Sequence, residues 1–157
     1  MRTTTIRKPF SRALYDKTDM KAKDIIRTYL EDQGHKLKKD IEQYYCDIEG
    51  EDGHGWEVEI KYSWKGEWPP SWEDVRIPHR KKRLIDKKGE ENITFCVLNS
   101  MCNQAWEIPG SVVAGAEVVE VSNKFVPKGE LFYSIFVSQA KKIFLTGENE
   151  YDTVQKS

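Results

Sequence analysis

The 157-residue sequence lacks several features that would assign it to a class of protein. No apolar run approaches the roughly 18 residues that cross a membrane, and the opening MRTTTIRKPF has no apolar core of a signal peptide. Linkers rich in Ser and Gly, internal repeats, Gly-rich phosphate loops, nucleophilic serine motifs and dinucleotide fingerprints are also missing. We therefore expect a cytoplasmic protein without a membrane partner.

Cysteine and histidine are scarce, and their spacing does not indicate a zinc site. The three cysteines form no CxxC pair, and the three histidines have no zinc-like or HNH-like spacing. Cys46, Cys96 and Cys102 lie in or near apolar segments, so we expect free and mostly buried thiols. Hydrophobic residues make up 38% of the chain and aromatic residues 11%, which predicts a folded protein rather than a disordered one.

Charge is distributed unevenly, although the net charge is only −1. Residues 1–40 hold 11 Lys and Arg against 6 Asp and Glu, and residues 41–60 hold none against 7. Residues 61–90 then hold 9 against 5. A basic segment suits a phosphate backbone, whereas an acidic one repels it unless cations intervene. An acidic cluster between two basic blocks therefore suits a protein that handles nucleic acid through bound metal.

The first expected element is an amphipathic helix near 18–33. Thr18 can cap its start and Gly34 its end. Its apolar side chains recur at helical spacing, and they are Ala22, Ile25, Ile26, Tyr29 and Leu30. Two strands, 41–49 and 56–64, then flank a Gly-rich turn and predict a hairpin.

The remaining chain predicts a loop, a helix, four strands and a last helix. Residues 65–78, rich in Pro and Trp, should form an ordered loop, and Pro78 can open a short basic helix that runs toward Gly89. Strands are expected near 93–98, 104–108, 117–122 and 131–137. Ser138 can cap a final helix with Ala140, Ile143 and Phe144 on its apolar face. This order predicts a mixed α/β fold in a single domain, with a sheet flanked by helices.

The hairpin brings acidic side chains and a lysine together. Strict alternation in the second strand places Glu57, Glu59 and Lys61 on one face. If the turn is centred on Gly53, Asp47 lies opposite Glu59 with Cβ atoms about 5 Å apart. Such carboxylates repel each other unless a cation intervenes, and oxygen ligands suit Mg²⁺. Lys61 would lie beside the ion, where it could orient or deprotonate a metal-bound water.

The pattern of Asp47 followed twelve residues later by Glu59-Ile60-Lys61, on a hairpin after an amphipathic helix, resembles the PD-(D/E)xK nuclease superfamily. The resemblance covers about residues 18–98. It implies a restriction-endonuclease-like mixed sheet, metal ligation by Asp47, Glu59 and the Ile60 carbonyl, and a water-activating Lys61. Mg²⁺ would be the cofactor, and Mn²⁺ would substitute for it.

The run from the first helix through GHKL to Asp47 is also similar to the resolvase-like branch of that superfamily. Members of this branch often add an acidic ligand from the first helix. The corresponding position here holds Lys23, and Asp19 and Asp24 are the acids nearest to it in sequence. Cys46 occupies the position directly before Asp47, where the motif that names the superfamily has proline.

A basic segment after the hairpin is the expected grip on nucleic acid. Its residues are Arg76, His79, Arg80, Lys81, Lys82 and Arg83. Trp64, Trp68 and Trp72 precede it at four-residue intervals and could stack on bases, or instead cover the core beneath a long loop. In the same way, the acidic face of the hairpin could be an ordinary solvated surface, as we expect for Glu49, Glu51, Asp52 and Glu57.

These observations predict one PD-(D/E)xK-like nuclease domain over residues 1–157. Its catalytic core would be 18–98, its C-terminal strands and helix 99–146, and its flexible ends 1–15 and 147–157. The expected activity is Mg²⁺-dependent cleavage of duplex or branched DNA, as in restriction, homing or resolvase enzymes, and a homodimer is plausible because two strands must be cut. The alternative is a non-catalytic nucleic-acid-binding module that retains the fold.

Overall fold

The structure is a computed structural model of the whole chain. It describes residues 12–39, 46–122 and 129–145, and the side chains of 12–19 are not among the described parts. The helices are α1 (Arg12–Asp32), α2 (Lys82–Lys88) and α3 (Gly110–Ala114), with short 3-10 turns η3 (His79–Lys81), η4 (Glu90–Asn92) and η5 (Val137–Gln139). The strands are β1 (Ile48–Glu49), β2 (Gly55–Ile60), β3 (Asp74–Pro78), β4 (Ile93–Leu98), β5 (Gln104–Pro109), β6 (Glu117–Val121), β7 (Glu130–Phe136) and β8 (Lys141–Phe144).

The strands form two sheets. A five-stranded sheet has the order β1-β2-β4-β5-β8, and a three-stranded antiparallel sheet has the order β3-β7-β6. In the larger sheet, β2 and β4 are parallel, and the other neighbours are antiparallel. The parallel pair requires a crossover connection, which includes β3 and α2. The predicted mixed α/β fold with a mixed sheet is therefore confirmed.

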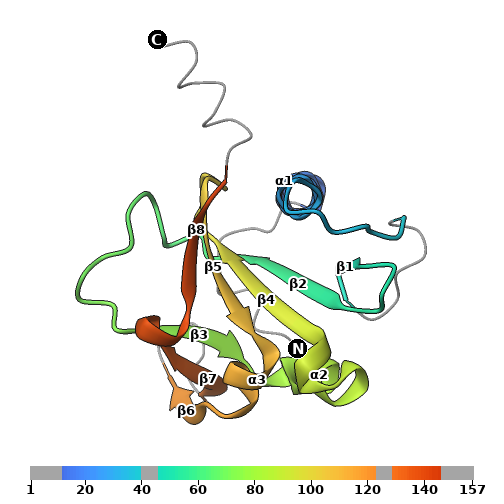
Figure 1. Cartoon of the computed structure of the whole chain (residues 1–157). Coiled ribbons are helices and arrows are strands. Elements are labelled where there is room, and N and C mark those ends of the chain that lie inside the picture. Colours follow the sequence, from blue (N-terminus) through green and yellow to red (C-terminus); the bar gives the residue numbers. More distant parts are fainter. Residues whose placement is uncertain (1–11, 40–45, 123–128, 146–157) are drawn as a thin grey trace.

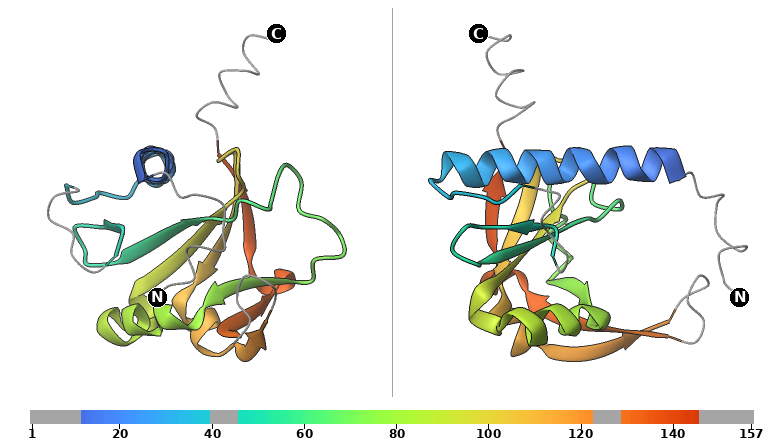
Figure 2. Two further views of the ribbon diagram at one scale, coloured as in Figure 1. Left: turned by 180° about the vertical axis from the view of Figure 1, so that it is seen from behind. Right: turned by 90° about the vertical axis from the view of Figure 1, so that its right-hand side faces the viewer.

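The two faces of the larger sheet are covered differently. Figures 1 and 2 show α1 across one face, and β3, β7 and β6 with the short helices α2 and α3 toward the other. On the α1 face, Ala22, Ile26 and Leu30 are buried against strand residues such as Trp56 and Val58. The prediction of a sheet flanked by helices therefore holds only in part, because a second sheet covers much of the face opposite α1.

The second core lies between the sheets. It is built from alternating side chains of β3, β4, β5 and β7, together with apolar residues of α2 and α3. Its buried members include Val75, Ile77, Phe95, Ile108 and Ile135. Because alternate residues of β2 point to this side, their side chains approach α2 and η3 rather than α1. This orientation places Glu57 and Glu59 of β2 near the basic segment.

Helix α1 follows the predicted apolar stripe but starts earlier than predicted. It begins at Arg12, so Thr18 lies inside the helix and does not start it. Gly34 ends it as expected, with φ of +97° and with the N–H of His35 donating to the carbonyl of Leu30. The expected flexible end 1–15 therefore contributes residues 12–15 to a helix, and the rest of 1–15 and all of 147–157 lie outside the described residues.

Two elements differ from the sequence prediction. Residues 74–78 form β3 instead of the end of a loop, since Val75 and Ile77 alternate into the core and the strand pairs with β7. The predicted final helix is wrong, because Lys141–Phe144 is a strand paired with β5. Burial there has a period of two, as Ile143 is buried and Phe144 is 61% exposed.

The second hairpin strand, predicted at 56–64, is Gly55–Ile60 and therefore ends before Lys61. Most other predicted elements lie close to their expected positions. β4, β5, β6 and β7 fall within two residues of the predicted strands, and η3 with α2 forms the basic helical segment before Gly89. Residues 41–45 of the predicted first hairpin strand lie outside the described parts. No helix in the described segments is long and apolar enough to cross a membrane.

Candidate functional site

The turn of the hairpin decides which residues face each other. Gly53 N–H donates to the carbonyl of Gly50, and Gly50 N–H donates to the carbonyl of His54. Gly53 has φ of +95°, and the Asp52 carboxylate accepts the N–H of His54. This is a three-residue loop with glycine in its left-handed last position, a geometry that only glycine adopts readily.

The observed register differs from the predicted one. Ile48 pairs with Trp56, so paired residue numbers sum to 104, whereas a turn centred on Gly53 required 106. The expectation that Asp47 lies directly across from Glu59 is therefore wrong. If the same register continues, Asp47 aligns with Glu57, because the glycine is the last loop residue instead of the middle one.

Asp47 nevertheless reaches along β2. Its carboxylate oxygen Oδ2 accepts the backbone N–H of Val58 at 2.8 Å, which extends the hydrogen bonding of the hairpin beyond the end of β1. Its other oxygen, Oδ1, lies 3.8 Å from the Nζ atom of Lys23 on α1. Asp47 is thus held between the edge of the sheet and the first helix.

A pocket of about 260 Å³ collects most of the predicted site. We name it the carboxylate pocket, and it is lined by Asp47, Glu57, Val58, Glu59, Ile60, Tyr62, Arg80 and Lys81. The three acids come from the hairpin, and Arg80 and Lys81 come from η3. Residues far apart in the sequence are therefore brought to one hollow by the packing of η3 over β2.

The acids of this pocket are only partly compensated by nearby cations. Burial, and next the Glu57 carboxylate, raise the pKa of Asp47 to about 6, against the opposing effects of the Val58 N–H and Lys23. Burial also raises the pKa of Glu59, although Lys81 opposes the shift. Both groups therefore ionise less readily than carboxylates in water.

Glu57 forms the strongest contact of the pocket. Only 7% of this residue is exposed, and its carboxylate accepts a short hydrogen bond from the Nζ atom of Lys81. The side chain of Lys81 is itself 14% exposed. Sequence reasoning had placed Glu57 among solvated acids, although strand alternation had already put it on the same face as Glu59.

Lys61 does not line the carboxylate pocket, and it lines a second pocket together with Trp72, Asp74 and Arg76. Its Nζ atom is 5.2 Å from the centre of the Trp72 ring, and it forms no ion pair within the described parts of the chain. Burial, together with Arg76, lowers the pKa of Lys61, although Glu59 opposes this. A half-buried ammonium without a carboxylate partner is costly, and a bound anion would offset that cost.

The rest of the predicted grip separates into different surroundings. Arg76 is exposed on β3, while the ring of His79 packs beside Tyr133 with centroids 5.0 Å apart. Lys82 and Arg83 are exposed on α2, outside both pockets, and Lys82 pairs with Asp86 at 2.9 Å.

Trp64 does not belong to a nucleic-acid surface, and this part of the prediction is wrong. The residue is fully buried, with its ring centroid 5.0 Å from that of Trp68 and 6.2 Å from that of Trp106. It fills the core beneath the Pro-rich segment, which was the alternative considered for these tryptophans. Trp72 packs against the same core but is only partly buried.

The first helix supplies a cation where an acid was sought. Lys23 faces Asp47, whereas Asp24 is exposed. The side chain of Asp19 is outside the described parts. Tyr62 lies after the last residue of β2, is 51% exposed and lines the carboxylate pocket.

The described residues contain no group of three or more His, Cys, Asp or Glu side chains that could hold one metal ion. Neither the known protein family models nor the curated protein sequences include a match to the chain. Functional inference therefore rests on the two pockets and their residues.

Proposed function

We propose that the protein is a metal-dependent DNA endonuclease and that the carboxylate pocket is its active site. The observation that carries the proposal is the meeting of Asp47, Glu59 and the Ile60 backbone with Arg80 and Lys81 in one hollow. Oxygen donors that attract a cation lie there beside cations that attract a phosphate. A phosphodiester bond is the substrate that requires both.

The donor chemistry suits Mg²⁺. Two carboxylates and one carbonyl oxygen are hard ligands, and Mg²⁺ binds through one or two carboxylates while it keeps several waters. Burial is the main cause of the raised pKa values of Asp47 and Glu59, and a bound cation would offset the cost of ionising both carboxyls. When bound by Asp47, Glu59 and the Ile60 carbonyl, the ion would supply a water of lowered pKa and a Lewis acid for the phosphate oxygen.

The chain's own residues would orient the substrate and stabilise charge. Arg80 has a side chain that is 65% exposed, so it can contact a DNA phosphate at the mouth of the pocket even though it pairs with Glu130. Lys61 has no carboxylate partner among the described side chains, and its ammonium can donate to a phosphate oxygen of the bound strand. Lys81 keeps Glu57 neutralised, which leaves Asp47 and Glu59 as the ligands.

The order of elements supports a restriction-endonuclease-like arrangement. Helix α1 precedes the acidic hairpin, and β4 lies parallel to β2 after a crossover that includes α2. Restriction, homing and resolvase-like enzymes remain candidates on this basis. We propose a homodimer for cleavage of both strands, since one chain carries one such pocket among its described residues.

The experiment is incubation of the full chain with supercoiled plasmid and with branched DNA in Mg²⁺ or Mn²⁺. We expect the wild type to cut at least one substrate, and Asp47→Ala and Lys61→Ala to lose activity. Glu51→Gln, a change at an exposed turn residue, is the matched control and should cut normally. Persistent cutting by both site variants would refute the assignment.

A non-catalytic nucleic-acid-binding module is the second candidate. The contacts of Lys23 with Asp47 and of Lys81 with Glu57 favour it, because they neutralise acids without any metal ion. Under this alternative the wild type would bind DNA but cut neither substrate in either metal.

A further inference from the structure

A second pocket is lined by Lys61, the residue that follows Ile60 of the carboxylate pocket in the chain. It has a volume of about 390 Å³, and it is lined by Lys61, Ser71, Trp72, Glu73, Asp74 and Arg76. We name it the tryptophan pocket. Its volume falls within the roughly 300–1,000 Å³ that is typical of small-ligand sites. A nucleotide is of suitable size.

Two cations of the tryptophan pocket are available to an anion. Lys61 forms no ion pair among the described residues, and it is close enough to Arg76 for the two positive charges to repel each other. Arg76 donates from Nε to Asp74 at 3.1 Å, and its side chain is 47% exposed. Its remaining guanidinium donors can therefore reach a phosphate oxygen together with the Lys61 ammonium.

The acids of the tryptophan pocket do not cancel this attraction. Asp74 accepts hydrogen bonds from Arg76 and, at 2.6 Å, from the Ser134 hydroxyl, and these bonds lower the pKa of its carboxyl despite partial burial. Glu73 is exposed to water, where its charge is screened. The pocket therefore keeps one cation, Lys61, that forms no ion pair among the described residues, beside the ring of Trp72.

Trp72 supplies the surface that a nucleobase needs. The ring of Trp68 lies at 85° to the indole of Trp72 with centroids 5.0 Å apart, and the Lys61 ammonium lies 5.2 Å from the indole centre. Trp68 also donates from Nε1 to the Trp72 carbonyl at 2.7 Å. An aromatic ring fixed in this way can contact any base, because every base has a π face.

We propose that the tryptophan pocket binds an unpaired nucleotide of the strand whose neighbouring phosphate lies in the carboxylate pocket. Lys61 and Arg76 hold its phosphate, and the indole of Trp72 contacts its base. A base within a continuous duplex is paired and stacked, so it must leave the stack to enter such a pocket. The substrate class is therefore DNA with an unpaired strand, such as an overhang or a branch. This inference rests on the proposed nuclease function.

The test is binding of a fluorescently labelled 12-nucleotide single strand and of the corresponding duplex to the full chain, measured by anisotropy in EDTA. We expect the single strand to bind at least about fivefold more tightly than the duplex, because a single stacked base contributes about 1–3 kcal/mol. Trp72→Ala and Arg76→Ala should each remove most of this preference. Lys141→Ala removes one positive charge from an exposed site on β8, outside both pockets, and should preserve it.

Arg76→Ala keeps the inference testable if Trp72→Ala fails to fold, because Arg76 is exposed and Trp72 packs against the core. Equal affinity for the two DNA forms, or equal effects of Arg76→Ala and Lys141→Ala, would overturn the inference. Strand preference that depends on Arg76, without cutting in Mg²⁺, would contradict only the nuclease proposal. Cutting of DNA without a preference for the single strand would contradict only the proposal that the tryptophan pocket binds an unpaired nucleotide.

Discussion

The pKa values of acidic residues shift in opposite directions at the two ends of the hairpin. At the turn end, Glu49 pairs with Lys88 at 2.7 Å and with Lys38 at 3.4 Å, and the hydrogen bond from Lys88 is the main cause of its lowered pKa. At the other end, burial raises the pKa values of Asp47 and Glu59. Both ends carry acids and lysines. Only at the turn end do the lysines outweigh the burial that raises the pKa of a carboxyl group.

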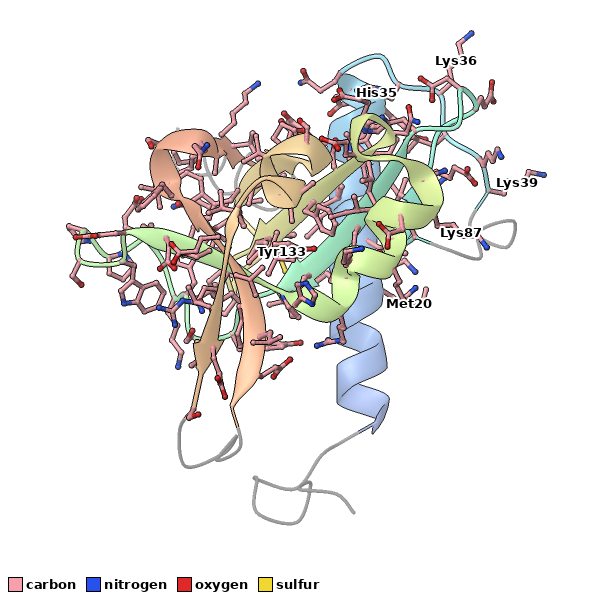
Figure 3. The ribbon with its side chains drawn as sticks, turned by 90° about the horizontal axis from the view of Figure 1, so that it is seen from below. Met20, His35, Lys36, Lys39, Lys87 and Tyr133 are labelled. Carbon is pink, nitrogen blue, oxygen red and sulfur yellow. The ribbon has the colours of Figure 1, made fainter. Side chains whose placement is uncertain are left out.

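The surroundings of the two ends explain the difference. Seen from below, Lys36, Lys39 and Lys87 lie on one side of the molecule, away from the β6–β7 hairpin (Figure 3). Lys88 also donates to the carbonyl of Gly53 at 2.6 Å, so this lysine stabilises the turn itself. The turn end is thus a structural ion cluster. The carboxylate pocket keeps its acids in an unfavourable state, which is typical of functional sites.

The largest expected difference between the two ends is in cleavage. Glu59→Gln removes a proposed metal ligand, and we expect a fall in rate of about 10²–10³-fold, comparable with the loss of one group that stabilises a transition state. Glu49→Gln is the matched change at the turn end and should stay within about twofold of wild type. Initial rates on the same DNA in Mg²⁺ measure both. Equal losses of cleavage rate in the two variants would show that the hairpin affects cleavage only through the stability of the fold.

The next difference is in the cost of removing a lysine. Lys81→Ala leaves Glu57 buried without its partner, and such a loss typically destabilises a protein by about 3–5 kcal/mol. Lys82→Ala breaks only an exposed pair with Asp86 one helical turn away, which is worth about 0.5 kcal/mol. Urea unfolding of the two variants and the wild type gives the comparison. A small effect of Lys81→Ala would mean that Glu57 finds another partner.

The pH dependence of stability should have opposite signs at the two ends. Because the folded pKa of Asp47 is raised from 3.8 to about 6, its ionisation destabilises the fold above about pH 6, and the fold regains that stability as the pH falls from about 6 to 4. In EDTA at pH 8, Asp47→Asn should therefore stabilise the protein, by at most about 3 kcal/mol for a shift of this size. The gain should shrink toward pH 4.

Glu49 supplies the control for this prediction. Its pKa is lowered, so its contribution is present above the unfolded pKa and is lost as the pH falls through the folded value. Glu49→Gln should therefore destabilise the protein at pH 8, because it removes the negative charge that pairs with Lys88 and Lys38. Thermal unfolding of both variants across this pH range tests the signs. Destabilisation by Asp47→Asn at pH 8 would contradict the account.

Local patterns predicted the elements better than the contacts between them. The apolar stripe of α1 and the alternation of β4 and β5 could be predicted from the sequence, because the burial of side chains repeats regularly within each element. β3 was missed because its partner, β7, lies about 60 residues away in the chain. β8 was taken for a helix because Ala140, Ile143 and Phe144 also fit helical spacing.

The candidate site shows the same limit. The residues Asp47, Glu59 and Ile60 were singled out from the sequence, and they do line one pocket with Arg80 and Lys81. The register of the hairpin was not predictable from Gly53 alone, because glycine can occupy either the middle or the last position of a turn. The roles of Glu57 and Lys23 depend on η3 and α1 packing beside the hairpin, which no local pattern encodes.

The most direct measurement of the central claim is the thermal unfolding temperature at pH 7.5 as Mg²⁺ is added. If the carboxylate pocket holds the ion, the unfolding temperature of the wild type rises with Mg²⁺, since a ligand at 100 times its Kd stabilises the fold by about 2.7 kcal/mol. Asp47→Asn should show no such rise, and Glu49→Gln should follow the wild type. An equal rise in all three proteins, or none in the wild type, would contradict the claim.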